Sequence, residues 1–419
     1  MKERPFVIIV GGGAAGMMAA HSAVCAGAAV TLIERNEKMG RKLYITGKGR
    51  CNLTNNCTAE TVLQNVPRNA KFLYSAMEQF PPEKTMEFFA SQGLKLKTER
   101  GNRVFPCSDK AADVIDTLFF ALKRERVRFV HGRVRDLMLA DGAVKGVVLE
   151  NGTQLEADCV VLATGGCSYP LTGSSGDGYR LAESAGHTVI EPKASLIPLV
   201  EDGADCARMQ GLALKNIEIK VRNQKKKVVF QEFGELLFTH FGLSGPVILS
   251  ASAHMRNFEK ERYTVSVDLK PALDEKKLDE RILRDFAENQ NREFANSLGA
   301  LLPRLMIPVI VERTGIAPEK RVHDLTKGER RTLLETIKRF DIPIAGTRPV
   351  SEAIVTSGGI KVSEINPSTM ESKKCSGLYF AGELIDVDAY TGGFNLQIAW
   401  ATAFAAANGC AAALHAQNH

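Results

Sequence analysis

Several patterns that mark common classes of protein are missing from this chain of 419 residues. It has nine cysteines, an odd number, and no two of them form a Cys-x-x-Cys pair. Neither a disulfide framework nor a zinc site built on paired cysteines is therefore indicated. Reduced thiols are typical of the cytosol, so we expect a cytoplasmic protein.

The chain also lacks a long hydrophobic run. The apolar stretch Phe6–Val10 is far too short for a signal peptide and leads directly into glycines. Residues 389–419 contain no Lys, Arg, Asp or Glu, but they are rich in alanine and carry amides such as Gln397. Because alanine and amides transfer poorly into lipid, we expect a buried helix here and no membrane partner.

A strong excess of one charge is absent as well. The net charge is +6 and the pI is about 8.7, below the value of about 9 that suggests a nucleic-acid-binding domain. We therefore expect a small-molecule substrate rather than a nucleic acid, and the oligomeric state stays open. With 44% hydrophobic residues, the length is enough for two or three domains.

Residues 40–55, GRKLYITGKGRCNLTN, combine three glycines with four cations, yet they are not a Walker phosphate loop. That motif requires Gly-x-x-x-x-Gly-Lys-Ser/Thr. Here Gly47-Lys48 is followed by Gly49, and Lys42 stands where the first glycine belongs. What this loop holds has to be inferred from its surroundings.

What the sequence does contain is a dinucleotide-binding unit. The run Phe6–Val10 leads into GGGAAG at residues 11–16, a helix of small residues, and a second apolar run, residues 30–33, that ends at Glu34. This is G-x-G-x-x-G between a strand and a helix, followed by an acid about 20 residues on. The carboxylate of Glu34 would accept hydrogen bonds from ribose hydroxyls and repel a 2′-phosphate. The nucleotide is therefore expected to be NAD or FAD.

A predicted β-meander favours FAD. Residues 127–166 alternate apolar and polar positions and carry Asp141-Gly142 and Asn151-Gly152, dipeptides typical of hairpin turns. They end in an apolar strand and Thr164-Gly165-Gly166. A three-stranded meander that returns to the sheet in this way resembles the FAD domain of the glutathione-reductase-like flavoproteins.

Two stretches near the end of the sequence also favour FAD. Residues 377–388 read as a short strand that ends at Gly382-Glu383, where such flavoproteins carry Gly-Asp. Residues 390–407 begin a long helix at Gly392-Gly393. The N-terminus of such a helix can stabilise the anion of a reduced flavin.

The middle of the chain reads as an insertion into the nucleotide-binding domain. Strands are predicted at residues 196–200, 217–221, 228–231, 236–239 and 263–269, and charged helices from 274 to 337. The run Lys225-Lys226-Lys227 between two strands indicates a solvated hairpin turn, with an RNA contact as the alternative. We predict an α/β fold, a Rossmann-type FAD-binding domain (parallel sheet plus three-stranded β-meander) interrupted by a β-barrel and a helical insert. The expected domains are 1–190 and 351–419 for FAD, 191–270 with 338–350 for the barrel, and 271–337 for the helices.

Four stretches, together with the N-terminal fingerprint, resemble the BaiN-like (YhiN-type) bacterial flavoproteins. They are GRKLYITGKGRCNLTN at 40–55, LFTHFGLSGPVIL at 237–249, VTSGGI at 355–360 and YTGGFNLQIAW at 390–400. The resemblance covers essentially the whole chain and implies an NAD(P)/FAD-dependent oxidoreductase. Ile398 stands where the family more often has an aromatic residue.

The resemblance also places residues 40–55 across the pyrophosphate and the flavin. Arg41 and Lys42 would offset phosphate charge, and Cys51 would lie near the ring system. Redox catalysis by Cys51 with Cys57 is an alternative to a packing role for Cys51. The predicted cofactor-binding residues are Gly11, Gly13, Ala14, Ala15, Gly16, Glu34, Arg35, Arg41, Lys42, Thr46, Gly47, Gly49, Arg50, Cys51, Asn52, Val134, Thr164, Gly165, Gly166, Gly382, Glu383, Asp386, Gly392, Gly393, Phe394, Asn395 and Leu396.

The sequence identifies the cofactor more specifically than the reaction. His240 is a candidate acid–base group and Arg348 a candidate proton donor, since residues 356–360 resemble a stretch of fumarate-reductase-like proteins. No second G-x-G-x-x-G exists, so NAD(P)H is expected to bind only transiently. We expect hydride to pass through the flavin to a small-molecule acceptor such as an activated C=C or carbonyl compound. An FAD-dependent oxidase, a tRNA-modifying flavoprotein and a sensor without turnover are the alternatives.

Overall fold

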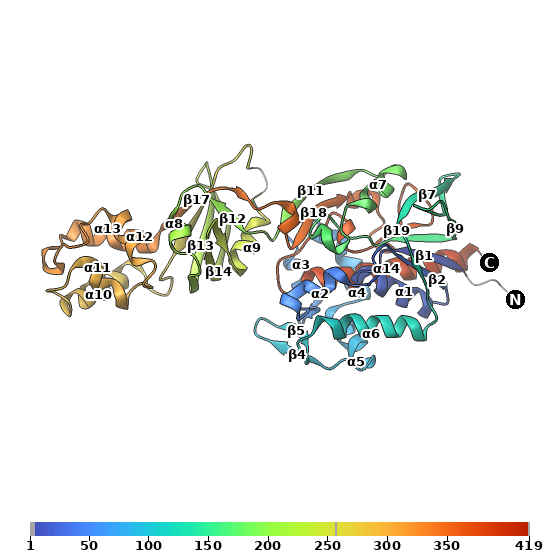
Figure 1. The fold of residues 1–419 in the computed structure, drawn as a ribbon, viewed down its shortest axis with the longest axis horizontal. Coiled ribbons are helices and arrows are strands. Elements are labelled where there is room, and N and C mark those ends of the chain that lie inside the picture. Colours follow the sequence, from blue (N-terminus) through green and yellow to red (C-terminus); the bar gives the residue numbers. More distant parts are fainter. Residues whose placement is uncertain (1–4, 256–257, 418–419) are drawn as a thin grey trace. The chain divides into compact units, whose positions relative to one another are not determined.

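The chain is divided between two compact units. The computed structural model describes residues 5–255 and 258–417. The first unit is Met1–Ser195 with Val350–His419, and the second is Leu196–Pro349 (Figure 1). Both ends of the chain thus belong to one unit, and the second unit is an insertion into it.

A five-stranded parallel sheet forms the centre of the first unit. Its strands are β1 (Phe6–Val10), β2 (Ala29–Glu34), β6 (Arg128–His131), β10 (Cys159–Leu162) and β19 (Leu378–Phe380), in the order β19-β10-β1-β2-β6. All of β10 and nearly all of β1 are buried, as expected for a parallel sheet covered on both faces. The predicted Rossmann-type sheet is confirmed.

The helices of this unit are built for close packing. The helix α1 (Ala14–Cys25) consists largely of small residues and packs against α14 (Phe394–Gln417), which is also alanine-rich. The predicted C-terminal helix is therefore confirmed. In the described part of the chain, no helix is long and apolar enough to cross a membrane. The other helices of the unit are α2 (Arg41–Ile45), α3 (Ala59–Gln64), α4 (Tyr74–Gln79), α5 (Pro82–Ser91), α6 (Ala111–Arg124) and α7 (Asp177–Ser184).

The predicted meander is also present. Strands β7 (Val134–Ala140), β8 (Ala143–Leu149) and β9 (Gln154–Glu156) pair antiparallel in that order. The turn between β7 and β8 is Asp141-Gly142, with φ of 52° and 72°. Two consecutive left-handed residues are the requirement of a tight hairpin turn, which explains why Asp-Gly marked it in the sequence.

Two smaller sheets complete the first unit. Strands β3 (Thr54–Asn55), β5 (Arg103–Pro106) and β4 (Leu96–Glu99) form one of them, in that order. Strands β11 (Val189–Ser195) and β18 (Val355–Ile360) pair antiparallel in the other. Every residue of β18 is buried, so its polar side chains need partners inside the protein.

The second unit contains a closed six-stranded barrel, as predicted. Its strands are β12 (Leu199–Glu201), β13 (Ala213–Asn223), β14 (Val228–Thr239), β15 (Gly242–Ser244), β16 (Tyr263–Asp268) and β17 (Phe340–Thr347), and neighbouring strands are antiparallel. Residues 228–239 form one strand where the sequence predicted two. The register shift between β13 and β14 near Ile217 lets β14 stay paired across Gly234.

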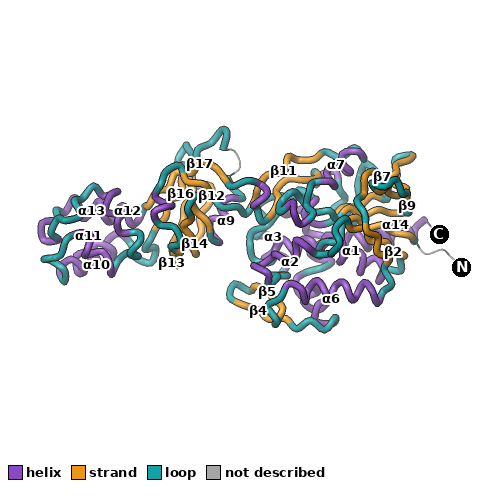
Figure 2. The backbone as a smooth tube through the Cα atoms, in the orientation of Figure 1, coloured by secondary structure: helices purple, strands orange, loops and turns teal. Residues whose placement is uncertain are grey.

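Helices make up the rest of this unit. Figure 2 shows the strand-rich barrel and the helical region as neighbouring parts of it. One hydrophobic core includes Ile282 and Leu333 from the helices and Phe340 from the barrel. The helices are α8 (Asp205–Arg208), α9 (Pro246–Ser252), α10 (Glu275–Ala287), α11 (Phe294–Ser297), α12 (Ile307–Thr314) and α13 (Lys327–Lys338).

The packing of α1 on β1 gives a test of the glycine motif. A Cβ added at Gly16 would lie 1.7 Å from the carbonyl oxygen of Gly11, whereas one added at Gly13 would meet no atom of the described chain within 4 Å. We expect Gly16→Ala to lower the free energy of unfolding of FAD-free protein by about 1–3 kcal/mol or more, because backbone must move. Gly13→Ala should cost no more than about 1 kcal/mol.

Urea unfolding of the two FAD-free variants measures this difference. Equal stabilities of Gly16→Ala and Gly13→Ala would contradict the close packing of α1 on the turn after β1.

Candidate functional site

The loops that follow the parallel strands meet at one edge of the sheet. A Cβ at Gly11, after β1, would lie 2.5 Å from the carbonyl oxygen of Ala163, after β10. A Cβ at Gly382, after β19, would lie 2.8 Å from the Cβ of Ala15. The loops after β1, β10 and β19 are therefore in contact, and ligands of open α/β sheets bind at this carboxyl edge.

The start of α1 faces open space in this loop cluster. Gly13 is the N-cap residue, and no described side chain caps the helix there. An added Cβ at Gly13 has no atom of the described chain within 4 Å. A 12-residue helix with an uncapped, uncovered N-terminus presents free N–H groups and the positive end of its dipole.

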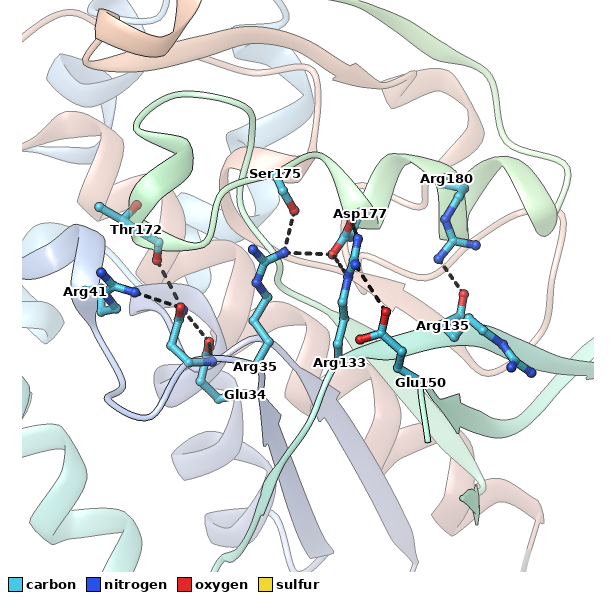
Figure 3. A network of polar contacts seen from close by, with 11 residues as sticks. Glu34, Arg35, Arg41, Arg133, Arg135, Glu150, Thr172, Ser175, Asp177 and Arg180 are labelled. Atoms are coloured by element: carbon cyan, nitrogen blue, oxygen red, sulfur yellow. Dashed lines mark hydrogen bonds and ion pairs between the residues drawn. The ribbon is translucent and has the colours of Figure 1, made fainter. Parts of the chain in front are cut away.

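Glu34 is held in place at the end of β2. Its Oε2 accepts a hydrogen bond from the backbone N–H of Gly12 at 2.6 Å. Its Oε1 accepts from the backbone and the side-chain nitrogen of Asn36 at 2.8 and 2.7 Å. Arg41 donates to the side-chain oxygen of the same Asn36 at 3.0 Å (Figure 3). The carboxylate is thus oriented before any ligand arrives, and further lone pairs stay open.

Arg35 points toward the start of α7. Its guanidinium donates to the hydroxyl of Ser175 at 2.7 Å and to the carboxylate of Asp177 at 3.0 Å. Arg133 binds the same carboxylate with two hydrogen bonds of 2.8 and 2.7 Å (Figure 3). These bonds from Arg133 keep the pKa of Asp177 below its usual value. The charge of Arg35 is therefore partly balanced within the protein.

Lys42 and Glu383 form an ion pair across the site. The ammonium of Lys42 lies 2.6 Å from Oε2 of Glu383 and 2.6 Å from the hydroxyl of Ser168. The other carboxylate oxygen, Oε1, accepts from the backbone N–H of Thr356 at 2.8 Å and from Ser168 at 3.0 Å. Burial would raise the pKa of Glu383, but Lys42 and these hydrogen bonds lower it. Glu383 is thus an anion whose partners come from three distant segments.

The glycines after β10 fit against strand β18. The hydroxyl oxygen of Thr356 accepts from the backbone N–H groups of Cys167 and Ser168 at 2.8 and 3.0 Å. A Cβ on Gly166 would lie 2.5 Å from that same oxygen. Only a glycine lets this loop approach β18 closely enough for both bonds.

A second cluster of charges was missed by sequence reasoning, which named only Asp386. Nη2 of Arg68 donates to Ser357 at 2.6 Å and to Asp386 at 2.9 Å, and it lies 3.3 Å from Asp388. Asp388 is 1% exposed and accepts from Ser195 at 2.7 Å. The two acids of residues 386–388 were the available signal, but Arg68 lies about 320 positions away.

Several buried polar atoms of the first unit have no hydrogen-bond partner among the described residues, and three of them lie in the segments discussed above. They are Oδ1 of Asn52, Oγ1 of Thr164 and Nε of Arg68. Leaving a buried polar group unpaired costs about 1–3 kcal/mol. Asn52 and Thr164 belong to the predicted cofactor-binding set, so a bound ligand is a physical explanation for their open hydrogen-bonding capacity.

Residues 40–55 contain Cys51, whose thiol is buried and therefore a poor nucleophile. Cys51 is completely buried, and burial raises the pKa of its thiol to about 12, although Thr46 lowers it. Burial also raises the pKa of Cys57 to about 11. Because the thiolate is the nucleophile, these values favour the packing role for Cys51.

The guanidinium of Arg50 has acidic partners of its own. It donates to Asp109 at 2.7 Å and to Glu99 at 2.5 Å, and it lies 4.2 Å from the centre of the Phe105 ring. Thr46 donates its hydroxyl to the carbonyl of Leu43 at 2.6 Å. These two predicted residues thus make contacts within the protein that fix the shape of the loop.

The start of α14 is fixed against β3. Gly393 has φ of 97°, and an added Cβ would lie 2.3 Å from the carbonyl oxygen of Thr54. The amide of Asn395 donates to the carbonyl of Ala389 at 2.7 Å and accepts from its N–H at 2.9 Å. Asn395 therefore supports the turn, which leaves backbone N–H groups as the candidates for ligand contact.

The other predicted cofactor-binding residues of the first unit lie at the starts or ends of elements. They are Ala14 and Ala15 in α1, Gly47 and Gly49 after α2, Val134 in β7, Gly165 after β10, Gly392 before α14, and Phe394 and Leu396 in α14.

The two predicted catalytic residues belong to the second unit and share one neighbour. The imidazole of His240 lies 4.9 Å from the Phe241 ring, edge to face. The guanidinium of Arg348 lies 4.9 Å from the same ring. His240 is exposed and Arg348 is half-buried, and both contact the ring of Phe241.

The Lys42–Glu383 pair gives a test of the site's electrostatics. The two side chains are 23% and 19% exposed, so the pair is less buried than pairs whose rupture costs 3–5 kcal/mol. We expect Lys42→Met and Glu383→Gln each to destabilise FAD-free protein by about 1–3 kcal/mol. The double variant should lose less than the sum, because neither charge is then left alone.

The pH dependence has a definite sign. A carboxyl whose pKa is lowered by folding stabilises the protein above its unfolded pKa of about 4.3, and this stabilisation is lost as the pH falls through the folded pKa. Urea unfolding should therefore show that the free energy of unfolding of the wild type falls at acid pH, and that it falls less in Glu383→Gln. If the double variant instead loses the full sum of the two single losses in free energy of unfolding, Lys42 and Glu383 do not interact.

Comparison with known proteins identifies the family. The HI0933-like protein Rossmann domain model matches residues 5–409. The chain is 33% identical to the 3-dehydro-bile acid delta(4,6)-reductase of Clostridium scindens, over 96% of this chain and 98% of that protein. It is 32% identical to the ribosomal RNA dihydrouridine synthase of Escherichia coli, over 98% and 99%.

Solved structures agree on the fold. The 3-ketosteroid delta1-dehydrogenase of Sterolibacterium denitrificans is similar over 97% of this chain and 99% of that chain, with a TM-score of 0.51 and 13% identity. The Sdh1 complex of Mycobacterium smegmatis in the apo form is similar over 99% and 69%, with a TM-score of 0.51 and 18% identity. With a whole-length family match and relatives above 30% identity, the chain belongs to the HI0933-like family of FAD-dependent flavoprotein oxidoreductases.

Proposed function

We propose that this protein is an FAD-dependent reductase of C=C bonds conjugated to a carbonyl group. The observation that carries the proposal is the pair of names borne by its full-length relatives. One is a bile acid delta(4,6)-reductase, and the other makes dihydrouridine. Dihydrouridine differs from uridine by two hydrogens across a C=C bond next to a carbonyl. The two substrates differ greatly in size but share this bond.

The residues at the sheet edge fit FAD. Gly13 and the uncapped start of α1 would hold the pyrophosphate, since a Cβ at Gly13 meets nothing within 4 Å among the described atoms. Glu34, held by Gly12 and Asn36, would accept ribose hydroxyls. The unpaired buried oxygens of Asn52 and Thr164 supply capacity that a cofactor can use.

When bound, FAD supplies two-electron hydride chemistry. The protein's own residues would position it and balance charge. The backbone N–H groups at the start of α14, after Gly392 and Gly393, would face an anionic group. The charge of Lys42 is balanced by Glu383, so Lys42 would help to orient the cofactor but would supply little net positive charge. NAD(P)H is the proposed donor, and it would bind transiently because the sequence has one nucleotide fingerprint.

Reduction of a conjugated C=C bond also needs a proton at the carbon α to the carbonyl. His240 and Arg348 are the proposed sources, since the imidazole and the guanidinium each lie 4.9 Å from the ring of Phe241. A nearby cation would also stabilise the negative charge that builds on the carbonyl oxygen.

An RNA substrate is the second candidate. The relatives named ribosomal RNA dihydrouridine synthases match this chain along nearly its whole length. Lys225, Lys226 and Lys227 are exposed in the turn between β13 and β14. Three exposed lysines can bind phosphate, but such a turn is also ordinary solvated surface, so we place the small-molecule acceptor first.

Anaerobic absorbance titration of FAD-loaded protein tests the proposed function. We expect NADH or NADPH to bleach the flavin band near ~450 nm, and a small α,β-unsaturated ketone to restore it. Restoration only by ribosomal RNA at low salt would favour the second candidate. A flavin that neither nucleotide reduces, or that only O₂ reoxidises, would overturn the proposal in favour of a different donor or an oxidase.

Binding of FAD to Glu34 has its own test. Glu34→Gln replaces one acceptor oxygen by a donor, and we expect FAD affinity to fall about tenfold, as for the loss of one hydrogen bond to a charged group. Glu37→Gln is the matched control, because Glu37 is exposed and lies three positions away. Fluorescence titration of apoprotein with FAD measures both. Equal losses in the two variants would argue against a contact between Glu34 and the ribose.

A further inference from the structure

Three potential metal ligands lie together on a face of the first unit that the proposed function does not use. His21 and Cys25 stand one turn apart on α1, and Glu125 follows the last residue of α6. Nδ1 of His21 lies 2.6 Å from Oε1 of Glu125, and Nε2 lies 3.7 Å from Sγ of Cys25. One ligand atom from each residue falls within 4.8 Å of the others.

We propose that His21, Cys25 and Glu125 form a binding site for a divalent transition metal, with Zn²⁺ as the best match. Zinc is bound in proteins by imidazole nitrogen, thiolate sulfur and carboxylate oxygen, and this cluster offers one of each. A spacing of four residues places two side chains on the same helix face, which is the geometry of a helical chelate.

The distances are close to those that zinc requires. With bonds of about 2.0–2.3 Å to nitrogen, oxygen and sulfur, tetrahedral ligand atoms lie about 3.3–3.6 Å apart. The nitrogen that faces Glu125, Nδ1 of His21, lies 4.0 Å from Sγ of Cys25, so this distance would have to shorten by about 0.4 Å. The 2.6 Å between His21 and Glu125 is a hydrogen bond, which would open by less than about 1 Å by rotation of side chains when a cation replaces the proton.

The imidazole and the carboxylate are held in position by their surroundings. The ring of His21 packs against Phe88, with 4.8 Å between ring centres. The side chains of His21 and Glu125 are only 16% and 21% exposed. Oε2 of Glu125 is buried and has no hydrogen-bond partner among the described residues. This oxygen therefore has a lone pair that a bound cation can use.

The charge of the cluster also suits a cation. A divalent cation would bind the thiolate of Cys25 and offset the negative charge of the Glu125 carboxylate. Without a metal, the cluster is an ordinary His–Glu hydrogen bond with a thiol beside it, and that arrangement gives no partner to the second oxygen of Glu125.

A fourth ligand could enter from a small pocket. His21 and Cys25 form part of its wall, together with Phe80, Phe404 and Asn408. Three protein ligands and one open position are the pattern of zinc sites that bind water. The pocket therefore leaves room for a water molecule as the fourth ligand.

Alkylation of cysteine in the wild-type, FAD-loaded protein tests the site without any variant. Cys25 and Cys107 are the two cysteines that are exposed in the described chain. We expect Zn²⁺ to slow alkylation of Cys25 at least tenfold and to leave Cys107 unchanged, because a metal-bound thiolate is shielded. Peptide mass spectrometry reports both rates. Equal alkylation of Cys25 with and without Zn²⁺ would overturn the proposal.

Metal affinity of variants gives the second measurement. Competition with a chromophoric chelator should show one Zn²⁺ per chain, bound at least tenfold more weakly by Cys25→Ala and Glu125→Gln. Cys107→Ala is the matched control and should bind as wild type does. Zinc bound with the same affinity by Cys25→Ala would place it elsewhere and contradict the proposal. X-ray absorption should find one sulfur at about 2.3 Å in the wild-type complex.

Discussion

The carbonyl oxygen of Gly11 leaves no room for a side chain at position 16, and much of the first unit depends on that contact. A Cβ at Gly16 would lie 1.7 Å from this oxygen, so α1 can approach the turn after β1 only without one. The same turn brings Gly11 against the backbone after β10. Since all five strands are parallel, fixing the first turn fixes where their carboxyl ends meet. The open space at Gly13 is a consequence of that packing.

Charges tie the loops at this edge to parts of the chain that are remote in sequence. Lys42 reaches Glu383, and Arg68 reaches Asp386 and Ser357. Each cation is balanced by a nearby acid, which avoids the cost of an unpaired half-buried charge. Balanced pairs hold position but offer little net charge to a ligand. Under the proposed function, backbone N–H groups and helix termini would therefore supply most of the attraction for phosphates.

Local patterns explain what could be predicted from the sequence. The turn at Asp141-Gly142, the meander and the individual strands of the sheet and the barrel each follow from residues close together in the chain. Partners separated by hundreds of residues could not be predicted. Arg68 carries no motif, and Glu125 lies 104 positions from His21. The single strand at residues 228–239 was missed because a bulge depends on the partner strand, which the local pattern does not contain.

The relatives constrain how substrate choice can change within the family. A bile acid and a uridine in RNA share the reducible bond but little else, and both relatives match this chain along almost its full length. The residues that would hold FAD cannot select between such different substrates, because they would bind the same cofactor in each protein. The second unit is inserted between Ser195 and Val350 and has its own hydrophobic core. Its surface can therefore change without disturbing the packing of the parallel sheet, so substitutions in the two units can be tolerated independently.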